Sequence, residues 1–213
     1  MKYPWLVAIM RRNPDGFHGC GGTIIASRFV TTAAHCTYEV EVKEDKGPRI
    51  VVTEFRGRDM AVRIGEYNVA VYGETGLEKN INVLQIHRHD EWRQPLNQPF
   101  NRGGYDFAIL ELETDINLKV FPPACLAKET DGTTFDGKKV TVVGWGLMSE
   151  FPKPPDRKAK TPNELNITIE ENCDFGGFTR APNYFHMCAG RWSYLDGPEP
   201  DKYWYYRSTC TVS

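Results

Sequence analysis

Residues 32–36, Thr-Ala-Ala-His-Cys, form the stretch of this chain whose chemistry is easiest to interpret. His35 follows two small alanines and precedes Cys36, and we expect a disulfide at that cysteine to hold the histidine rigidly at the edge of a core. An imidazole that transfers protons must lie within hydrogen-bonding distance of its partner and keep one tautomer. His35 is therefore a candidate general base.

Asp106 is the second candidate, because it immediately precedes the apolar run 107–110, Phe-Ala-Ile-Leu. A carboxylate buried at the start of such a strand needs a partner, and an imidazole N–H is a natural one. The residues alone leave two interpretations open. Either His35 and Asp106 form a base and its orienting acid, or they are a core histidine and a turn aspartate that never meet.

Short segments rich in β-branched and aromatic residues must position these side chains, and Gly, Pro, Asn and Asp separate them. The clearest predicted strands are 5–10, 23–26, 29–32, 62–67, 81–87, 107–112, 139–144 and 165–169. No window shows a sustained helical stripe of apolar residues. We therefore predict an all-β fold, either a sandwich or barrels.

Three further segments complete this pattern. Alternation over 165–169 places Asn166 and Thr168 on a solvated face. The proline- and charge-rich stretch 151–158 is predicted to be a surface loop, and the chain could cross between two halves near 121–123. The aromatic run 203–206 shows no alternation typical of a strand.

Composition narrows the class of protein. The 213 residues suit one large domain or two packed halves. Lys and Arg number 26 against 28 Asp and Glu, so no basic field exists to bind a nucleic-acid backbone. Apolar residues make up 40% and charged residues 25%, as in ordinary globular proteins. No apolar run approaches the ~18 residues of a membrane-spanning helix.

The six cysteines indicate export to an oxidising compartment. Cys20 and Cys36 are widely separated, as are Cys173 and Cys188, and such spacing favours disulfides over a zinc or redox CxxC site. The sequon at Asn166 agrees with a secreted glycoprotein. Residues 1–10 are too briefly apolar for a signal peptide, so we expect them to form a strand and the natural chain to start upstream.

A set of short motifs, in a fixed order, resembles the chymotrypsin-like (trypsin-type, S1) family of serine proteases. The matching segments are 3–7 (Tyr-Pro-Trp-Leu-Val), 20–25 (Cys-Gly-Gly-Thr-Ile-Ile), 32–36, 62–67 (Val-Arg-Ile-Gly-Glu-Tyr), 105–110, 123–126 (Pro-Ala-Cys-Leu), 143–146 (Val-Gly-Trp-Gly) and 187–190 (Met-Cys-Ala-Gly). The resemblance implies a single peptidase domain of two packed six-stranded antiparallel β-barrels, about residues 1–120 and 121–213, with the catalytic groups in the cleft between them. It also implies the disulfides Cys20–Cys36 and Cys173–Cys188.

The resemblance makes His35 the general base of a Ser-His-Asp triad and Asp106 the carboxylate that orients it, in the chain order of this family. The nucleophilic serine of the family lies in a Gly-Asp-Ser-Gly-Gly-Pro segment, which residues 1–213 do not contain. None of the serines considered as substitutes has that setting: Ser149, Ser193, Ser208 and Ser213. The family's Ile-Val-Gly-Gly type N-terminus is also absent. We therefore expect an inactive fragment with an incomplete second barrel.

Two cysteines have no partner under this scheme. Cys125 resembles the cysteine that links the family's catalytic domain to a pro-region or a late segment, and Cys210 would pair beyond Ser213; the alternative is that they pair with each other.

Ser208 falls where the family's primary pocket has its floor. A serine there would favour apolar or aromatic substrate side chains over basic ones.

Metal binding is not expected, and no cofactor is predicted. Glu66, Glu74 and Glu78 lie where some family members bind calcium, but a solvated acidic loop is the favoured interpretation. His87 and His89 would share one face of a strand, yet no third ligand accompanies them. We expect them to be surface histidines at a strand end.

The leading hypothesis is a secreted, extracellular serine endopeptidase domain that acts on protein or peptide substrates, with protease inhibitors as further partners. The alternative is a non-catalytic protease homologue that binds or regulates a partner. The missing serine segment is also compatible with an incomplete gene sequence. A nucleic-acid ligand and a membrane span are excluded in either case.

Overall fold

The computed structural model describes residues 1–12, 16–43, 49–92, 105–127, 135, 137–146, 159–170, 173–175, 178–180, 188–195 and 203–208. It divides the chain into two compact units, Met1–Leu126 and Ala127–Ser213. Within the described residues, the regular elements are β-strands and two short 3₁₀ helices. The all-β fold class predicted from the sequence is confirmed.

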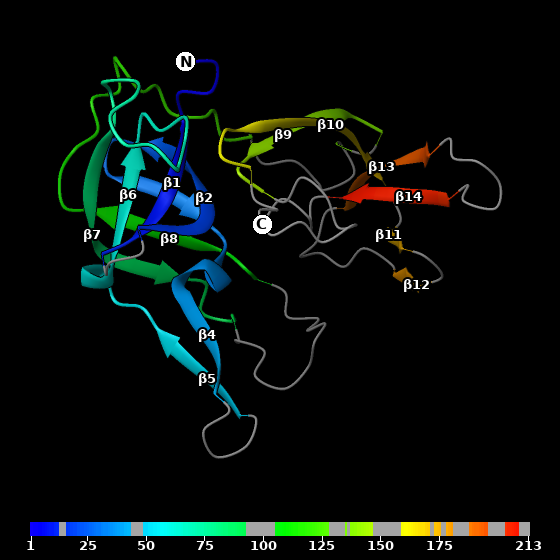
Figure 1. Ribbon diagram of the computed structural model, residues 1–213, viewed down its shortest axis with the longest axis horizontal. Helices are drawn as coiled ribbons and strands as arrows, with labels where there is room; N and C mark the ends of the chain where they lie inside the picture. The colour runs from blue at the N-terminus through cyan, green and yellow to red at the C-terminus, as the bar shows by residue number, and fades with distance from the viewer. Residues whose placement is uncertain are drawn as a thin grey trace. The chain divides into compact units, whose positions relative to one another are not determined.

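The first unit is built on a closed barrel of six antiparallel strands (Figure 1). In order around the barrel they are β1 (Leu6–Arg11), β2 (Phe17–Ala26), β3 (Phe29–Thr32), β8 (Ala108–Leu112), β7 (Lys79–Arg88) and β6 (Met60–Ile64). The barrel closes because β1 pairs with both β2 and β6. Closure leaves no edge of this barrel exposed for pairing with another chain.

Branched apolar side chains fill the barrel. The buried cluster consists of Val7, Ile9, Ile24, Val30, Phe55, Met60, Val62, Ile64, Ile81, Val83, Leu110, Leu112, Ile116 and Phe121. Along β8 the buried positions alternate with partly exposed ones, as period-two strands require. Each fully buried Val, Leu or Ile contributes about 1.5–3 kcal/mol. This core makes the barrel the rigid scaffold of the first unit.

The sequence-predicted strand 62–67 ends earlier than expected, because β6 stops at Ile64. Gly65 has a φ of +73°, and a Cβ on it would lie 2.5 Å from the carbonyl oxygen of Leu77. Only glycine tolerates both that conformation and that approach. The chain therefore turns out of the barrel at Gly65, and Glu66 and Tyr67 belong to the following loop.

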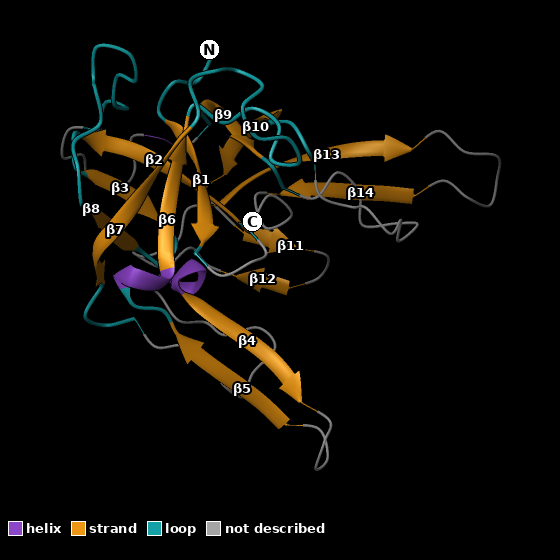
Figure 2. Cartoon of the chain, turned by 60° about the vertical axis from the view of Figure 1, so that its left-hand side comes forward, coloured by secondary structure: helices purple, strands orange, loops and turns teal. Residues whose placement is uncertain are grey.

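A hairpin of β4 (Tyr38–Lys43) and β5 (Arg49–Glu54) forms its own two-stranded sheet and extends away from the barrel (Figures 1 and 2). It begins directly after the 3₁₀ helix η1 (Ala34–Thr37) and is followed by a second 3₁₀ helix, η2 (Gly57–Asp59). The sequence analysis predicted no strand between residues 33 and 61. The valine-rich stretch 50–53 was the available signal for this hairpin.

The second unit contains a four-stranded antiparallel sheet. Its strand order is β14 (Tyr203–Ser208), β13 (Cys188–Leu195), β10 (Asn163–Glu170) and β9 (Lys139–Gly144). A separate hairpin joins β11 (Cys173–Phe175) to β12 (Phe178–Arg180). The predicted alternation along β10 is confirmed, because Ile167 and Ile169 are buried while Asn166 is exposed.

The aromatic run 203–206 is a strand, contrary to the sequence analysis. Its backbone pairs with β13, with Trp204 opposite Tyr194 and Tyr206 opposite Trp192. Because the paired strand supplies the backbone hydrogen bonds, a strand can form without alternation of polar and apolar residues. Tertiary pairing therefore overrides the local pattern here.

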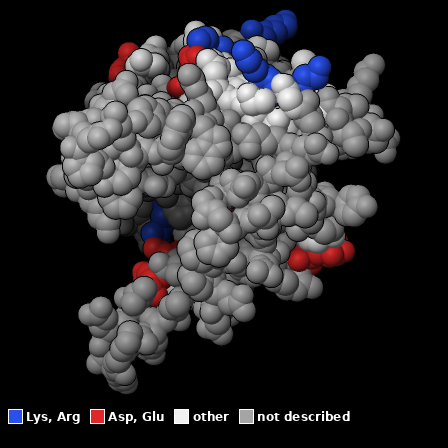
Figure 3. Space-filling model, turned by 90° about the vertical axis from the view of Figure 1, so that its right-hand side faces the viewer, with Lys and Arg blue, Asp and Glu red and all other residues white. Residues whose placement is uncertain are grey.

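The described surface of the molecule carries charges of both signs. Figure 3 shows basic side chains along the upper edge of one face and again lower down beside acidic ones, with acidic side chains at several separate places. The net charge of −2 agrees with this mixture. Among the described residues, no helix has the length and apolar character needed to cross a bilayer.

Candidate active site

His35 lies in η1, the short 3₁₀ turn that follows β3. Ala34 is fully buried against Ala108 and Trp92, whereas the side chain of His35 is 42% exposed. Small residues at 33 and 34 let the turn sit close to the barrel, so the following imidazole projects from a packed base toward solvent. The predicted position of His35 at the edge of a core is thus observed.

Contacts from strands β2 and β7 hold η1 in place, and a hydrogen bond to β2 fixes the end of β3, from which η1 leaves. Cys36 is joined by a disulfide to Cys20 of β2, with a Cα–Cα distance of 6.1 Å. The hydroxyl of Thr32, the last residue of β3, donates to the carbonyl oxygen of Gly21 at 2.9 Å. Within the turn, the hydroxyl of Thr37 donates to the carbonyl oxygen of Ala34 at 2.7 Å.

Arg88, the last residue of β7, supplies the third anchor. Its Nε donates to the Thr37 hydroxyl at 2.6 Å and its Nη2 to the Phe55 carbonyl oxygen at 2.7 Å, while Nη1 pairs with Glu54 at 2.7 Å. The side chain of Arg88 is only 17% exposed. Arg88 thereby ties the turn that carries His35 to the base of the β4–β5 hairpin. The sequence analysis did not identify Arg88, because an arginine at a strand end has no local signature.

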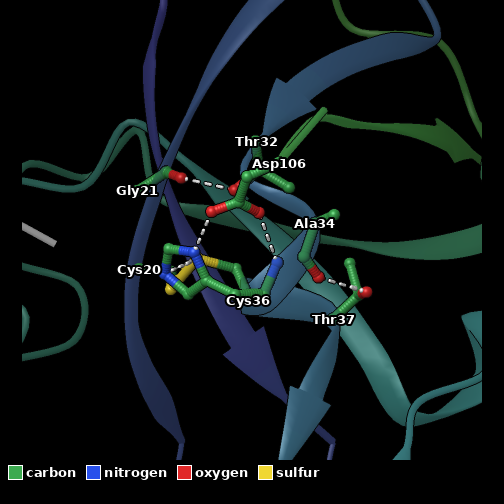
Figure 4. A network of polar contacts seen from close by, with 8 residues as sticks. Cys20, Gly21, Thr32, Ala34, Cys36, Thr37 and Asp106 are labelled. Atoms are coloured by element: carbon green, nitrogen blue, oxygen red, sulfur yellow. Dashed lines mark hydrogen bonds and ion pairs between the residues drawn. A yellow bond between two sulfur atoms is a disulfide. The ribbon is translucent and has the colours of Figure 1, made fainter. Parts of the chain in front are cut away.

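Asp106 lies just before β8, and its carboxylate contacts His35 at two points (Figure 4). Oδ2 lies 2.7 Å from His35 Nδ1, and Oδ1 accepts the backbone N–H of His35 at 2.8 Å. The two side chains therefore meet although they are 71 residues apart in the sequence. The alternative of a core histidine and a turn aspartate that stay apart does not describe this structure.

The Asp106 carboxylate is less buried than the sequence analysis expected, since 35% of the side chain is exposed. It is paired all the same, because a partly desolvated carboxylate still gains from charge-assisted hydrogen bonds. Bonds to both the ring and the backbone of His35 fix its orientation as well as its position.

This geometry determines the protonation of both groups. The hydrogen bond to Asp106 raises the pKa of His35 above its ordinary value of 6.5, against the opposing effect of burial. Burial tends to raise the pKa of Asp106, but the hydrogen bonds from the His35 ring and backbone outweigh it and lower that pKa below 3.8. An ionised Asp106 therefore faces His35 near neutral pH.

An ionised carboxylate on Nδ1 requires the proton of neutral His35 to sit on that nitrogen. The lone pair is then on Nε2, the nitrogen turned away from Asp106. Nε2 lies 3.5 Å from Cys36 Sγ, and the imidazole is partly open to solvent. Such an imidazole can accept a proton at Nε2 while Asp106 stabilises the resulting cation.

The serines considered as nucleophiles all belong to the second unit. Ser149 and Ser213 lie outside the described residues. Ser193 and Ser208 lie on β13 and β14, and their side chains are not described.

The predicted cysteine pairings have different outcomes. The disulfide Cys20–Cys36 is present, and Cys125 is a free, exposed thiol. The backbones of Cys173 and Cys188 lie on β11 and β13, but their side chains are outside the described part of the chain, as is Cys210. The second disulfide therefore stays a prediction.

The acidic residues considered for calcium do form a cluster. Glu66, Glu74 and Glu78 each bring one carboxylate oxygen within 4.8 Å of the others. Glu66 is buried and paired with Arg63 at 2.9 Å, so the expected solvated acidic loop is wrong for this residue. Hydrogen bonds led by the Thr75 backbone lower the pKa of Glu78.

The fit of this cluster to a cation is mixed. Oε2 of Glu78 is buried without a hydrogen-bond partner among the described residues, which suits a cation. Arg63 already neutralises Glu66 and also donates to Asn80 at 2.8 Å. A bound calcium would be held by Glu74 and Glu78 beside an already paired Glu66, and the proton transfer at His35 has no step that uses it.

The two histidines considered as metal ligands, His87 and His89, are surface residues, as predicted. His87 is exposed on β7 and its Nε2 lies 3.1 Å from Glu111 Oε2. His89 follows the end of β7, is exposed, and stacks on the ring of Tyr105 at a centroid distance of 4.3 Å. They therefore face different neighbours.

Comparison with known proteins agrees with the fold. Residues 1–191 match the family model described as Trypsin. The chain is 28% identical over 198 residues to phenoloxidase-activating factor 3 of Holotrichia diomphalia, covering 89% of this chain and 52% of that protein. It is 29% identical over 192 residues to coagulation factor XI of Bos taurus, covering 89% and 26%.

A third relative is serine proteinase stubble of Drosophila melanogaster, 28% identical over 201 residues, with 89% of this chain and 22% of that protein covered. The chain thus spans about half or less of the length of these relatives. The family match extends over most of the chain and includes both His35 and Asp106. The chain belongs to the trypsin family of serine proteases.

Proposed function

We propose that this chain supplies the general base and the orienting acid of a Ser-His-Asp endopeptidase. His35 Nε2 takes the proton of the attacking serine and later passes it to the leaving amine, while Asp106 keeps the ring in the required tautomer. The observation that carries the proposal is the 2.7 Å contact between His35 Nδ1 and Asp106 Oδ2, on a turn pinned by the Cys20–Cys36 disulfide. Proteolysis is the activity of the family, and its substrates are proteins.

The polypeptide of residues 1–213 contains no Gly-Asp-Ser-Gly-Gly-Pro segment. The oxyanion hole of the family uses backbone N–H groups of that segment. We therefore expect these 213 residues to form no acyl-enzyme, and the serine must be part of any protein in which the pair is catalytic.

Covalent labelling with a fluorophosphonate probe tests both halves of the proposal. The recombinant polypeptide of residues 1–213 should not be labelled. The protein purified from its source organism should be labelled, and a His35→Ala variant of it should lose the labelling, with His87→Ala as the matched control. Labelling that persists in His35→Ala would refute the assignment of the base.

A second function follows from the same sequence observation. Without the serine segment, the chain would act as a non-catalytic homologue that binds or regulates a partner. In that case the protein from the source organism would stay unlabelled, yet would still be folded. The two functions are therefore separated by the labelling of the natural protein.

We also propose that the protein is secreted and glycosylated at Asn166. The disulfide between Cys20 and Cys36 supports an oxidising compartment. Asn166 is exposed on β10, where its amide oxygen accepts a hydrogen bond from Thr141 at 2.7 Å. Mass spectrometry of protein from the culture medium, before and after glycosidase treatment, would detect a mass loss at the peptide that contains Asn166. Protease inhibitors are proposed as further partners.

A further inference from the structure

The segment that carries Asp106 has an unusual backbone. Among the described residues, Tyr105 is the one non-glycine residue with a positive φ, 68°. Side chains other than glycine, asparagine and aspartate rarely adopt this left-handed conformation, since Cβ then crowds the following carbonyl oxygen. Strained residues of this kind persist only where surrounding contacts hold them, and they cluster at functional sites.

The strained residue directly precedes the carboxylate that contacts His35. The N–H of Phe107 donates to the carbonyl oxygen of Tyr105 at 2.7 Å, so Asp106 occupies the centre of a three-residue turn. Within that turn, the backbone conformation of Tyr105 sets the side from which Asp106 leaves the chain. Both carboxylate oxygens point at His35, at 2.7 Å and 2.8 Å.

Residues 89–92 contact Tyr105 on the face of its ring. The imidazole of His89 stacks on the phenol ring with centroids 4.3 Å apart and planes 19° from parallel. The neighbouring Glu91 carboxylate adds to the effect of burial in raising the Tyr105 pKa. The ring is thereby held by the His89 stack.

The segment 89–92 is held together by its own hydrogen bonds and by one to the Asp106 segment. Its turn is closed by the N–H of Trp92, which donates to the carbonyl oxygen of His89 at 2.9 Å. The N–H of Glu91 donates to His89 Nδ1 at 3.2 Å and so orients the stacking imidazole. The N–H of His89 donates to the Phe107 carbonyl oxygen at 3.0 Å, which joins this turn to the Asp106 segment.

We propose that residues 89–92 act as a clasp on the Tyr105 ring, holding the backbone of Tyr105 in its left-handed conformation and thereby aiming the Asp106 carboxylate at His35. Tyr105 and His89 are positioning residues, because they act through Asp106. The inference rests on the proposed pairing of His35 with Asp106 and adds the device that maintains it. The clasp and the pair lie within the first unit.

Measuring the pKa of His35 tests the clasp without requiring catalysis. The polypeptide of residues 1–213 would be labelled with ¹³C at histidine Cε1 and titrated by NMR, and the signal of His35 assigned by its absence in His35→Ala. In the unmodified chain the pKa of His35 should lie above 6.5, because Asp106 stabilises the imidazolium. A value at or below 6.5 would refute the proposed pairing itself.

Two substitutions release the ring from the clasp. Tyr105→Ala keeps Cβ, and with it the strain, but removes the ring, so the backbone should relax and the pKa of His35 should fall toward its ordinary value. His89→Ala removes the stacking partner and should act in the same direction. If Tyr105→Ala unfolds the chain, His89→Ala carries the test. An unchanged pKa of His35 in a folded His89→Ala variant would overturn the proposal.

Two further variants separate an effect on the direction of the Asp106 carboxylate from a general loss of structure. Tyr105→Gly removes the ring together with the strain, since glycine adopts positive φ freely, and should keep the pKa of His35 above 6.5. A fall equal to that in Tyr105→Ala would overturn the claim that the backbone conformation aims the carboxylate. His87→Ala, two residues from His89 and paired with Glu111, is the matched control and should leave the pKa of His35 unchanged.

Discussion

The two segments that meet at the site are held in different ways. The η1 turn that bears His35 is fixed by a disulfide to β2 and by Arg88, whose hydrogen bonds join Thr37 to Phe55. The segment 105–107 that bears Asp106 has no covalent anchor, and depends on a three-residue turn and a ring stack. The position of the base therefore depends on the stability of the barrel, whereas the direction of the acid depends on one backbone conformation.

The most damaging change to this arrangement is Asp106→Asn. The amide would donate to His35 Nδ1 and so favour the wrong tautomer, with the proton on Nε2. In the protein purified from its source organism, we expect kcat for peptide hydrolysis to fall on the order of 10⁴-fold. Asp115→Asn, at an exposed position before Ile116, is the control. Retention of full activity by Asp106→Asn would contradict the role of the acid.

Removing the covalent anchor of η1 tests the other side of the comparison. The double variant Cys20→Ala with Cys36→Ala should lower the free energy of unfolding by about 3 kcal/mol, because the disulfide closes a loop of this length in the unfolded chain. Denaturant titration would measure the loss. Cys125→Ala alters a free, exposed thiol and should leave stability unchanged. Equal unfolding midpoints for the unmodified chain, the double variant and Cys125→Ala would mean that the disulfide contributes nothing to stability.

The arginine anchor should have a smaller effect. Arg88→Met leaves the Thr37 hydroxyl and the Phe55 carbonyl oxygen without their donor, and we expect a loss of about 2 kcal/mol in the free energy of unfolding. Arg58→Met is the matched control, because the Arg58 side chain is 71% exposed and its change should stay within about 0.5 kcal/mol. Similar values for the two variants would show that Arg88 is dispensable as an anchor.

The smallest expected effect is a pH dependence of stability from the His35–Asp106 pair. Asp106 raises the pKa of His35. The contribution of His35 to the free energy of unfolding is therefore present below pH 6.5 and is lost as the pH rises through the pKa of His35 in the folded state. His35 lowers the pKa of Asp106. The contribution of Asp106 to the free energy of unfolding is therefore present above pH 3.8 and is lost as the pH falls through the pKa of Asp106 in the folded state. Both contributions are present together between pH 3.8 and 6.5.

Urea denaturation of the unmodified chain and of Asp106→Asn, at about pH 5 and about pH 8, would measure this window. The difference in the free energy of unfolding should be larger at the lower pH. Solvent screening keeps it small, since both side chains are more than one-third exposed. If the difference in the free energy of unfolding between the two proteins were larger at about pH 8, its pH dependence would be opposite to the one expected. His35 would then not be the protonated partner of Asp106.

Much of the fold was predictable from local patterns. Strands with clear β-branched runs and flanking turn residues, such as β3 and β9, were predicted with the bounds that the structure shows. β6 was predicted too long, because the sharp turn at Gly65 depends on the close approach of Leu77. β14 was missed because its register is set by pairing with β13, a partner that no local window contains.

In the candidate site, too, some residues were recognisable from the local sequence and others only from the folded structure. His35 and Asp106 stand out in the sequence because their neighbours are distinctive: alanines and a cysteine around one, an apolar strand after the other. Arg88 and Tyr105 have no such surroundings. Arg88 matters because β7 ends beside Thr37, and Tyr105 because its φ is positive and His89 lies against its ring. Neither property is visible before the chain has folded.

Residue types and spacing were enough to predict an all-β chain with a candidate base and acid, and the resemblance of its ordered motifs added the protease family, because burial patterns and short motifs are local properties of the chain. The folded barrel decided that the two side chains meet, at 2.7 Å, despite a sequence separation of 71. It also decided how each is held: one by a disulfide and a half-buried arginine, the other by a strained turn. Such contacts join residues that are distant in sequence, and their geometry exists only once the strands have paired and the core has closed around them.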